Sequence, residues 1–171
     1  MNDFFAGLDV STQGQKIVVI DLQKNSVIYS DSINYDLDLP KYSTLNGVIR
    51  DTETGVSESN PKMWIDALHL LFERLKTSSD LIQFIKAISI AGQQHGLVAI
   101  DIDGNLAKPT SKLWNDFSTL EECEILTKEI GGSDQMIHAV ANSQRTGYTA
   151  SKIFHMYRNA VSYTHLRAHE T

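Results

Sequence analysis

The chain has 171 residues, of which 42% are hydrophobic and 21% are charged, a composition typical of one globular domain with a hydrophobic core. Its formal net charge of -6 argues against a nucleic-acid partner or an anionic membrane surface. Cys123 is the single cysteine, which excludes an intrachain disulfide and a cysteine-based metal site. No apolar run reaches membrane-spanning length and no signal sequence is apparent, so a cytoplasmic location is expected.

The N-terminal residues predict a β-hairpin with a polar turn. An apolar strand over residues 4–10 carries Asp9 near its end, the polar residues 11–15 follow, and a second strand covers residues 17–22. A carboxylate at the end of a buried strand, beside hydroxyl, amide and glycine groups, suits a magnesium–phosphate site. Gly14 would let the backbone approach such a ligand closely. A hairpin whose polar turn has no ligand is the alternative interpretation.

A third strand, a long loop and a helix are expected next. Residues 26–35 alternate well enough for an antiparallel strand, and the polar residues 36–60 predict a loop. Pro61 fits the first position of a helix that Ser59 or Asn60 would cap. The apolar stripe of this helix consists of Trp64, Ala67, Leu68, Leu71, Phe72 and Leu75.

Two apolar runs follow the helix. Residues 85–91 are typical of a buried parallel strand, and residues 97–102 predict a further strand that ends in a tight turn at 103–105. Between the two runs lies the polar segment Gly-Gln-Gln-His-Gly at residues 92–96. Strands that alternate with helices in this order predict an α/β fold with a mixed sheet.

The last third of the chain predicts three helices. Ser118 is expected to cap the first, which would run to residue 130. The second would cover residues 133–141, and Thr149 or Ser151 would open the third. Expected on the helix surfaces are His138, His155, Glu121, Glu122 and Glu124.

Four segments together resemble the N-terminal domain of the FGGY family of carbohydrate kinases, and within it the xylulokinases. Residues 7–16 are similar to the first phosphate motif and residues 88–96 to the sugar-binding turn. Residues 113–116 are similar to the tryptophan–aspartate loop, and residues 147–152 to the start of a helix that closes this half of the sugar pocket. The resemblance implies an incomplete ribonuclease-H-like domain of the actin and hexokinase type, with three antiparallel N-terminal strands and flanking helices.

The implied reaction is ATP-dependent phosphorylation of a sugar with Mg²⁺ as cofactor, and the implied substrate is a pentulose such as D-xylulose. Glycerol kinases carry Asn-Gln-Arg-Glu where this chain has Gly-Gln-Gln-His, which argues against glycerol. Asp9 is the implied metal ligand, with a role in positioning phosphate rather than as general base. The implied contacts to ATP phosphates are Asp9, Ser11, Thr12, Gln13 and Lys16.

A polyhydroxylated sugar needs amide, imidazole and carboxylate partners, and two segments after predicted strand ends supply them. The implied sugar contacts are Gln93, Gln94, His95, Trp114, Asn115 and Asp116. Alternatives stay open: His95 as an ordinary turn residue, Trp114 as a core residue, and the Asn115–Asp116 pair as a helix cap.

The family pattern also implies groups that lie outside this chain. Its general-base aspartate lies downstream of the matched segments, as does the second domain with most of the adenosine site. The chain is therefore expected to be a fragment without kinase activity of its own, with its domain at residues 1–160 and a non-family tail at 161–171. A homodimer is expected of the full-length protein. The alternative function is a non-catalytic sugar-binding module of the same fold.

Overall fold

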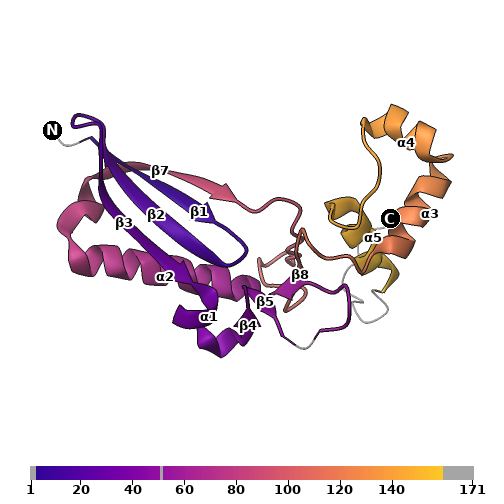
Figure 1. The fold of residues 1–171 in the computed structure, drawn as a ribbon, viewed down its shortest axis with the longest axis horizontal. Helices are drawn as coiled ribbons and strands as arrows, with labels where there is room; N and C mark the ends of the chain where they lie inside the picture. The colour runs from indigo at the N-terminus through magenta and orange to yellow at the C-terminus, as the bar shows by residue number, and fades with distance from the viewer. Residues whose placement is uncertain (1–2, 51, 160–171) are drawn as a thin grey trace.

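A four-stranded mixed sheet forms the N-terminal part of the computed structural model, which describes residues 3–50 and 52–159 (Figure 1). The strands follow the order β3-β2-β1-β7, with β1 antiparallel to β2 and parallel to β7. This arrangement confirms the predicted α/β fold with three antiparallel N-terminal strands. The bounds are Phe4–Val10 for β1, Gly14–Asp21 for β2, Ser26–Asn34 for β3 and Ile85–Gly92 for β7.

The helix α2, Pro61–Ser78, packs across this sheet. Its N-cap is Asn60, whose side chain accepts a hydrogen bond from the Lys62 amide at 2.9 Å, as the sequence predicts. The fully buried side chains of its apolar stripe meet alternate residues of β1 and β2 in one core, because a strand turns every second side chain to the same face. The core includes Ala67, Leu71 and Leu75 from α2, and Ala6, Leu8, Ile17 and Val19 from the strands.

The segment between β3 and α2 contains short elements where a loop was predicted. Each has two to four residues, too few for a periodic pattern to reveal. The Asp36 carboxylate organises them, since it accepts hydrogen bonds from the Thr44 hydroxyl at 2.7 Å and from the Gly47 amide at 3.1 Å. The elements are α1 (Tyr35–Asp38), η1 (Pro40–Tyr42), β4 (Thr44–Leu45), β5 (Val48–Ile49) and β6 (Glu58–Ser59).

The two predicted strands of the central region turn out differently. The strand β7 forms, but the prediction that it is buried is wrong: Ile88 is 46% and Ile90 is 66% exposed. Its one neighbouring strand in the described part of the chain is β1, and α2 makes its main sheet contacts with β2 and β3. Residues 97–102 form no strand: they are joined to the following residues by the isolated bridge Ile100–Leu106 and by a hydrogen bond from the Leu97 amide to the Lys112 carbonyl at 3.1 Å. The prediction of a strand at residues 97–102 is therefore wrong.

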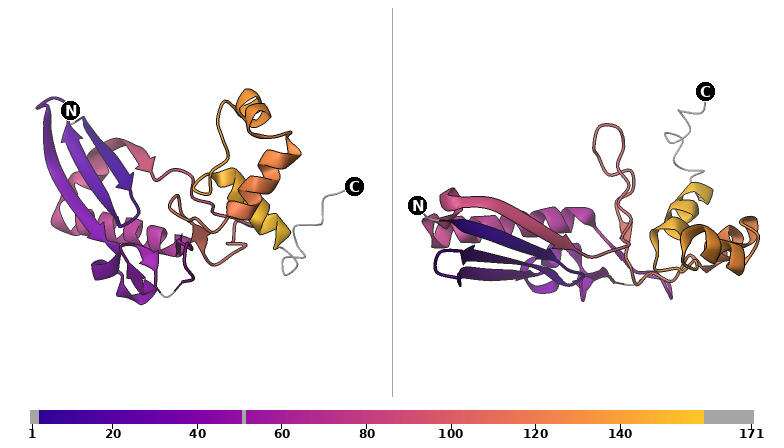
Figure 2. Two further views of the ribbon diagram at one scale, coloured as in Figure 1. Left: turned by 45° about the vertical axis from the view of Figure 1, so that its right-hand side comes forward. Right: turned by 90° about the horizontal axis from the view of Figure 1, so that it is seen from above.

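Three helices form a separate group at the other end of the molecule (Figures 1 and 2). They are α3 (Leu120–Glu129), α4 (Ser133–Val140) and α5 (Thr149–Arg158), close to the predicted ranges. Ser118 does not cap α3, because its hydroxyl donates to Asp116 at 2.7 Å instead. Between residues 3 and 159, residue 51 aside, no helix is both long and apolar enough to cross a membrane.

The surface position predicted for Glu122 is wrong. Its side chain is buried where α3 packs against α5, and its carboxylate accepts a hydrogen bond from Arg158 at 2.9 Å. His155 Nδ1 lies 3.2 Å from the same carboxylate. The helix pattern alone did not show that α3 and α5 pack through these polar groups. The tail predicted at 161–171 lies outside the described residues.

Candidate functional site

The parallel strands β1 and β7 bring the two predicted ligand-binding turns to one edge of the sheet. Val10 and Gly92 are register partners at the ends of these strands, and the Gln93 amide donates to the Val10 carbonyl at 3.0 Å. Residues 11–14, here called the phosphate turn, and residues 93–96, here called the sugar turn, therefore start side by side. The carboxyl ends of strands are where α/β sheets commonly bind ligands.

A chain of side-chain hydrogen bonds joins three of the predicted segments. The Trp114 indole Nε1 donates to Thr12 Oγ1 at 2.9 Å, and the Thr12 hydroxyl donates to Gln93 Oε1 at 3.4 Å. Trp114 is 51% exposed, which rules out the alternative of a core residue. The structure thus brings together an indole, a hydroxyl and an amide from segments about a hundred residues apart in the chain.

Two hydrogen bonds from Tyr35 hold the phosphate turn in place. Its hydroxyl donates to the Ser11 carbonyl at 3.3 Å, and its amide donates to the Gln13 carbonyl at 3.1 Å. The ring is fully buried, and this burial raises the pKa of Tyr35 to about 12. Across the turn, the Ser11 hydroxyl and amide both donate to the Gly14 carbonyl at 2.9 Å. The turn is therefore held by backbone groups and a neutral phenol.

Two glycines allow this close packing. At Gly14 a Cβ would collide with the Ile33 carbonyl oxygen, and at Gly47 it would collide with that of Thr12. Gly47 also has a φ of +77°, in the region that favours glycine. The β4–β5 hairpin therefore supports the outer side of the phosphate turn, a contact that the sequence did not predict.

Asp9 and Lys16 lie directly across from one another on β1 and β2, so their side chains leave the sheet on the same face. Both are exposed and line an open hollow of about 250 Å³ together with Ser11, Gln13 and Asn34. Within residues 3–50 and 52–159, Lys16 makes no ion pair. A carboxylate and a free cation beside a hydrogen-bonding turn form a surface suited to a phosphate with its metal.

These residues are compatible with Mg²⁺. No group of three acidic, histidine or cysteine side chains that could hold a metal ion occurs in the described residues. Mg²⁺ keeps several waters and commonly takes one or two carboxylates plus substrate phosphate oxygens. One exposed carboxylate beside a hollow is enough for such a site, so Asp9 fits the ligand role implied for it.

His95 occupies a left-handed backbone conformation, with φ at +60°, and its side chain is exposed. Its ring packs against that of Tyr148 with the centroids 4.8 Å apart. Its carbonyl accepts a hydrogen bond from the Lys152 ammonium at 2.7 Å. Gln94 beside it is also exposed. Imidazole and amide are thus both accessible at the end of the sugar turn.

Trp114 and Tyr148 line a second open hollow, of about 440 Å³. Arg145 also lines it, with its guanidinium 6.0 Å from the Tyr148 ring centroid. The walls are mostly apolar and aromatic, which suits the carbon skeleton of a sugar more than a phosphate. In the sugar turn, the buried Gln93 Nε2 makes no hydrogen bond to a described residue.

Asn115 and Asp116 contact protein groups in this structure. Ser57 donates from its hydroxyl to Asn115 Oδ1 and from its amide to Asp116 Oδ2, both at 2.8 Å. Asp116 is fully buried, and it also accepts from the Ser118 amide at 3.1 Å and from the Lys112 ammonium at 3.3 Å. The pair does not cap α3, whose N-cap position is Thr119 and has no side-chain cap hydrogen bond. Asp116 instead fixes its own loop, and its contact with sugar stays a prediction.

Sequence reasoning did not assign roles to Tyr148 or Lys152. Both lie in residues 147–152, the segment that resembles the start of the helix closing the sugar pocket, and that resemblance was the available signal. A tyrosine before a helix and a lysine within one are ordinary surface residues by pattern. Their contacts with His95 appear only when α5 is placed against the sugar turn.

Comparison with known proteins agrees with the four motifs. The sequence profile of the FGGY family of carbohydrate kinases, N-terminal domain, matches residues 4–165. The chain is 39% identical over 168 residues to the xylulose kinase of Schizosaccharomyces pombe, an alignment that covers 87% of this chain and 29% of that protein. It is 32% identical over 179 residues to the xylulose kinase of Rattus norvegicus, covering 91% of this chain and 33% of that one.

A solved structure shows the same fold. The protein described as a "xyloylose kinase from Brucella ovis" superposes with a TM-score of 0.75 at 27% sequence identity, and the match covers 93% of this chain and 30% of that one. The chain therefore spans about a third of the length of the curated relatives it matches.

Proposed function

Because the chain belongs to the FGGY family of carbohydrate kinases, we propose that the protein of which it forms part transfers the γ-phosphoryl group of ATP to a hydroxyl of a pentulose such as D-xylulose. The observation that carries this proposal is the hydrogen-bond chain from Trp114 through Thr12 to Gln93, which couples the phosphate turn to the sugar turn. The relatives that are themselves xylulose kinases support the choice of sugar.

The phosphate turn would act by position and charge. Phosphoryl transfer requires the reacting groups to be aligned and the phosphate charge to be neutralised. Asp9 would be the protein ligand of Mg²⁺, which would supply part of that neutralisation. Lys16 faces the same hollow and would add a positive charge, and Ser11 and Gln13 line it as well. The Ser11 hydroxyl and amide and the Thr12 hydroxyl donate to protein groups in this structure, so they would hydrogen-bond phosphate oxygens in exchange for those partners.

The sugar turn would select the ketose through neutral groups. His95 and Gln94 are exposed and donate to or accept from the sugar hydroxyls, and Gln93 has a free donor nearby. Trp114 presents an exposed indole on which the carbon skeleton packs. Asn115 and Asp116 would hold the Trp114 loop through Ser57, and they contact sugar only if that loop rearranges.

We propose that residues 1–171 alone bind the ketose weakly and do not catalyse its phosphorylation. In the family, the general base and the second domain lie downstream of the segments matched here. Ketose-dependent ATP consumption by the purified chain would contradict this. The domain boundary at residue 160, the homodimer and the cytoplasmic location stay predictions.

Thermal unfolding of the chain with D-xylulose, glycerol or neither tests the sugar assignment. A ligand that binds only the folded state at ten times its dissociation constant adds about 1.4 kcal/mol. That gain corresponds to a rise of about 3–6 °C in the unfolding midpoint of a domain of this size. We expect this rise with D-xylulose and none with glycerol at equal concentration. Equal effects of the two, or no effect of D-xylulose at any concentration, would overturn the assignment.

The variant Trp114→Phe tests the carrying observation. It removes the indole donor to Thr12 while keeping an aromatic ring, so we expect D-xylulose binding about tenfold weaker, as for the loss of one hydrogen bond of about 1.4 kcal/mol. Trp64→Phe is the matched control, because the buried Trp64 indole nitrogen makes no hydrogen bond to a described residue. Equal effects of the two variants would refute the coupling between the turns.

A further inference from the structure

Lys152 is a buried cation without a carboxylate partner. Its side chain is fully buried, and its ammonium donates to the carbonyls of His95 and Gly147, both at 2.7 Å. No described carboxylate lies within 4 Å of this ammonium. Removing a charged group from water is costly unless hydrogen bonds compensate for it. The two carbonyls are the compensation that the structure provides, so the ammonium and these segments depend on one another.

The first carbonyl belongs to the strained residue of the sugar turn. His95 adopts a φ of +60°, which non-glycine residues seldom do and which costs free energy unless the surroundings maintain it. The same residue carries the imidazole that packs on Tyr148. A hydrogen bond to its carbonyl therefore fixes a backbone conformation on which the direction of the imidazole depends.

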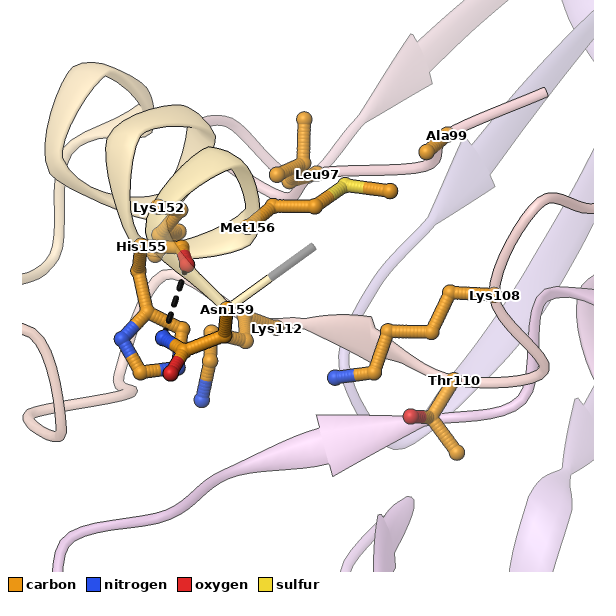
Figure 3. Close-up of a pocket in the computed structure, with 9 residues that line it drawn as sticks. All are labelled: Leu97, Ala99, Lys108, Thr110, Lys112, Lys152, His155, Met156 and Asn159. Atoms are coloured by element: carbon orange, nitrogen blue, oxygen red, sulfur yellow. Dashed lines mark hydrogen bonds between the residues drawn. The ribbon is translucent and has the colours of Figure 1, made fainter. Parts of the chain in front are cut away.

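The second carbonyl belongs to a segment that is packed against the Trp114 loop. A Cβ at Gly147 would lie 2.6 Å from the Trp114 carbonyl oxygen, so the two backbones are in close contact. Lys152 thus lies where the sugar turn, the Trp114 loop and residues 145–148 meet. On its other side, α5 borders a hollow of about 100 Å³ that Lys112 and Met156 also line (Figure 3).

We propose that Lys152 is a positioning residue for the sugar site, whose ammonium holds the His95 carbonyl and thereby orients the His95 imidazole. The proposal rests on the proposed function insofar as His95 contacts the ketose. It adds that the placement of His95 depends on α5, a helix about sixty residues further along the chain. Burial lowers the pKa of Lys152, and the charge of Asp116 opposes this shift. The amine nevertheless keeps N–H donors in either protonation state.

The test compares Lys152→Met with Lys152→Arg in the 171-residue chain. Methionine keeps the length and removes the donors, whereas arginine keeps the charge and the donors. We expect Lys152→Met to shift the backbone and imidazole NMR resonances of His95 and to weaken D-xylulose binding at least tenfold. We expect Lys152→Arg to restore both at least in part. Unchanged His95 resonances in Lys152→Met would overturn the proposal, as would a failure of arginine to restore either property.

Two controls separate positioning from stability. Lys76→Met removes an exposed lysine from α2 and should change nothing. Leu75→Ala destabilises the sheet core far from Lys152 and should leave the His95 resonances in place. If Leu75→Ala shifts the His95 resonances as Lys152→Met does, the role of Lys152 is only structural and the proposal fails.

A measurement on the unsubstituted chain covers the case in which Lys152→Met does not fold. A scalar coupling between the Lys152 ammonium nitrogen and the His95 carbonyl carbon is expected, and its absence would contradict the proposal. The His95 resonances also separate the two proposals. If the unsubstituted chain fails to bind D-xylulose, the sugar assignment fails, while the dependence of His95 on Lys152 is still decided by these spectra.

Discussion

The phosphate turn and the sugar turn start side by side but are held in place by different kinds of group. The phosphate turn is contacted directly by uncharged groups, which are the Tyr35 phenol and the close backbone contacts at Gly14 and Gly47, while the Asp36 carboxylate holds the hairpin that carries Gly47. The sugar turn and the loop beside it rest on buried charges, among them Lys152 and Asp116. Substitutions that disturb packing should therefore destabilise the phosphate turn most. Substitutions that remove a charge should destabilise the sugar turn most.

Removal of a buried charge near the sugar turn should have the largest effect. Asp116→Ala removes the buried acceptor that the Lys112 ammonium shares with the amides of Ser57 and Ser118. Lys112 keeps Glu58 Oε1 at 3.4 Å, so the cost comes mainly from the two buried amides, at about 1–3 kcal/mol each. We therefore expect a loss of about 3–5 kcal/mol in the free energy of unfolding, measured with urea.

Asp116→Asn is the matched control, because it keeps the shape and the acceptor oxygen for Ser57 while removing the charge. The free energy of unfolding of Asp116→Asn should lie between that of the unsubstituted chain and that of Asp116→Ala. If Asp116→Ala costs less than about 1 kcal/mol, in the range of an exposed pair, the sugar side does not depend on buried charge. The contrast between the two turns would then be wrong.

A methyl group placed against the phosphate turn should have the next largest effect. Gly47→Ala adds both the strain of a positive φ and a collision with the Thr12 carbonyl, so we expect a loss of about 3 kcal/mol in the free energy of unfolding. Gly104→Ala isolates the strain, because φ there is +82° but nothing lies within 4 Å of the added carbon. Its expected loss is about 1 kcal/mol. Equal losses would show that the phosphate turn yields to the added methyl group.

Alkaline pH should weaken the phosphate turn through Tyr35. Burial raises the pKa of Tyr35 from 10.0 to about 12, so above pH 10 the unfolded chain loses the phenolic proton before the folded chain does. The contribution of the neutral phenol is complete below pH 10 and is lost as the pH rises from about 10 to about 12. At about 1.4 kcal/mol per pKa unit, the loss is at most about 2–3 kcal/mol.

The unfolding midpoint as a function of pH tests this prediction. Tyr35→Phe should partly flatten the profile between pH 10 and 12, since it removes one titrating group. Tyr42, whose pKa burial and Asp66 also raise to about 12, titrates over the same range, so Tyr35→Phe should remove only part of the slope and the double variant with Tyr42→Phe should remove more. The assignment to Tyr35 is refuted if Tyr42→Phe flattens the profile and Tyr35→Phe does not.

The sequence predicted those parts of the fold whose cause is local. The apolar alternation of β1 and the stripe and Asn60 cap of α2 gave the correct elements, because each pattern repeats over several turns or strand pairs. The apolar run of β7 was correctly predicted as a parallel strand, but its burial was not. Burial depends on which other segments cover a strand, and an apolar run carries no information on that.

The sequence predicted residues of the candidate site, but it did not predict the residues that hold them in place. The resemblance of the motifs gave Thr12, Gln93 and Trp114, and the structure joins them in one hydrogen-bonded chain. It did not give Tyr35, Gly47 or Lys152, which contact the turns from distant segments. These residues act through tertiary contacts, and a lysine in a helix or a glycine in a loop has the same appearance in the sequence whether or not it makes such a contact.

The burial of Cys123 turns the single cysteine into a chemical reporter on the helical end of the molecule. The thiol lies on α3, which packs against the helix that carries Lys152, and burial raises its pKa. A thiol that is mostly buried and protonated reacts slowly with alkylating reagents, and faster when the helices separate. Its labelling rate under native conditions therefore measures the free energy of that local opening. No engineered cysteine or attached dye is needed, since the sequence has no other thiol to compete.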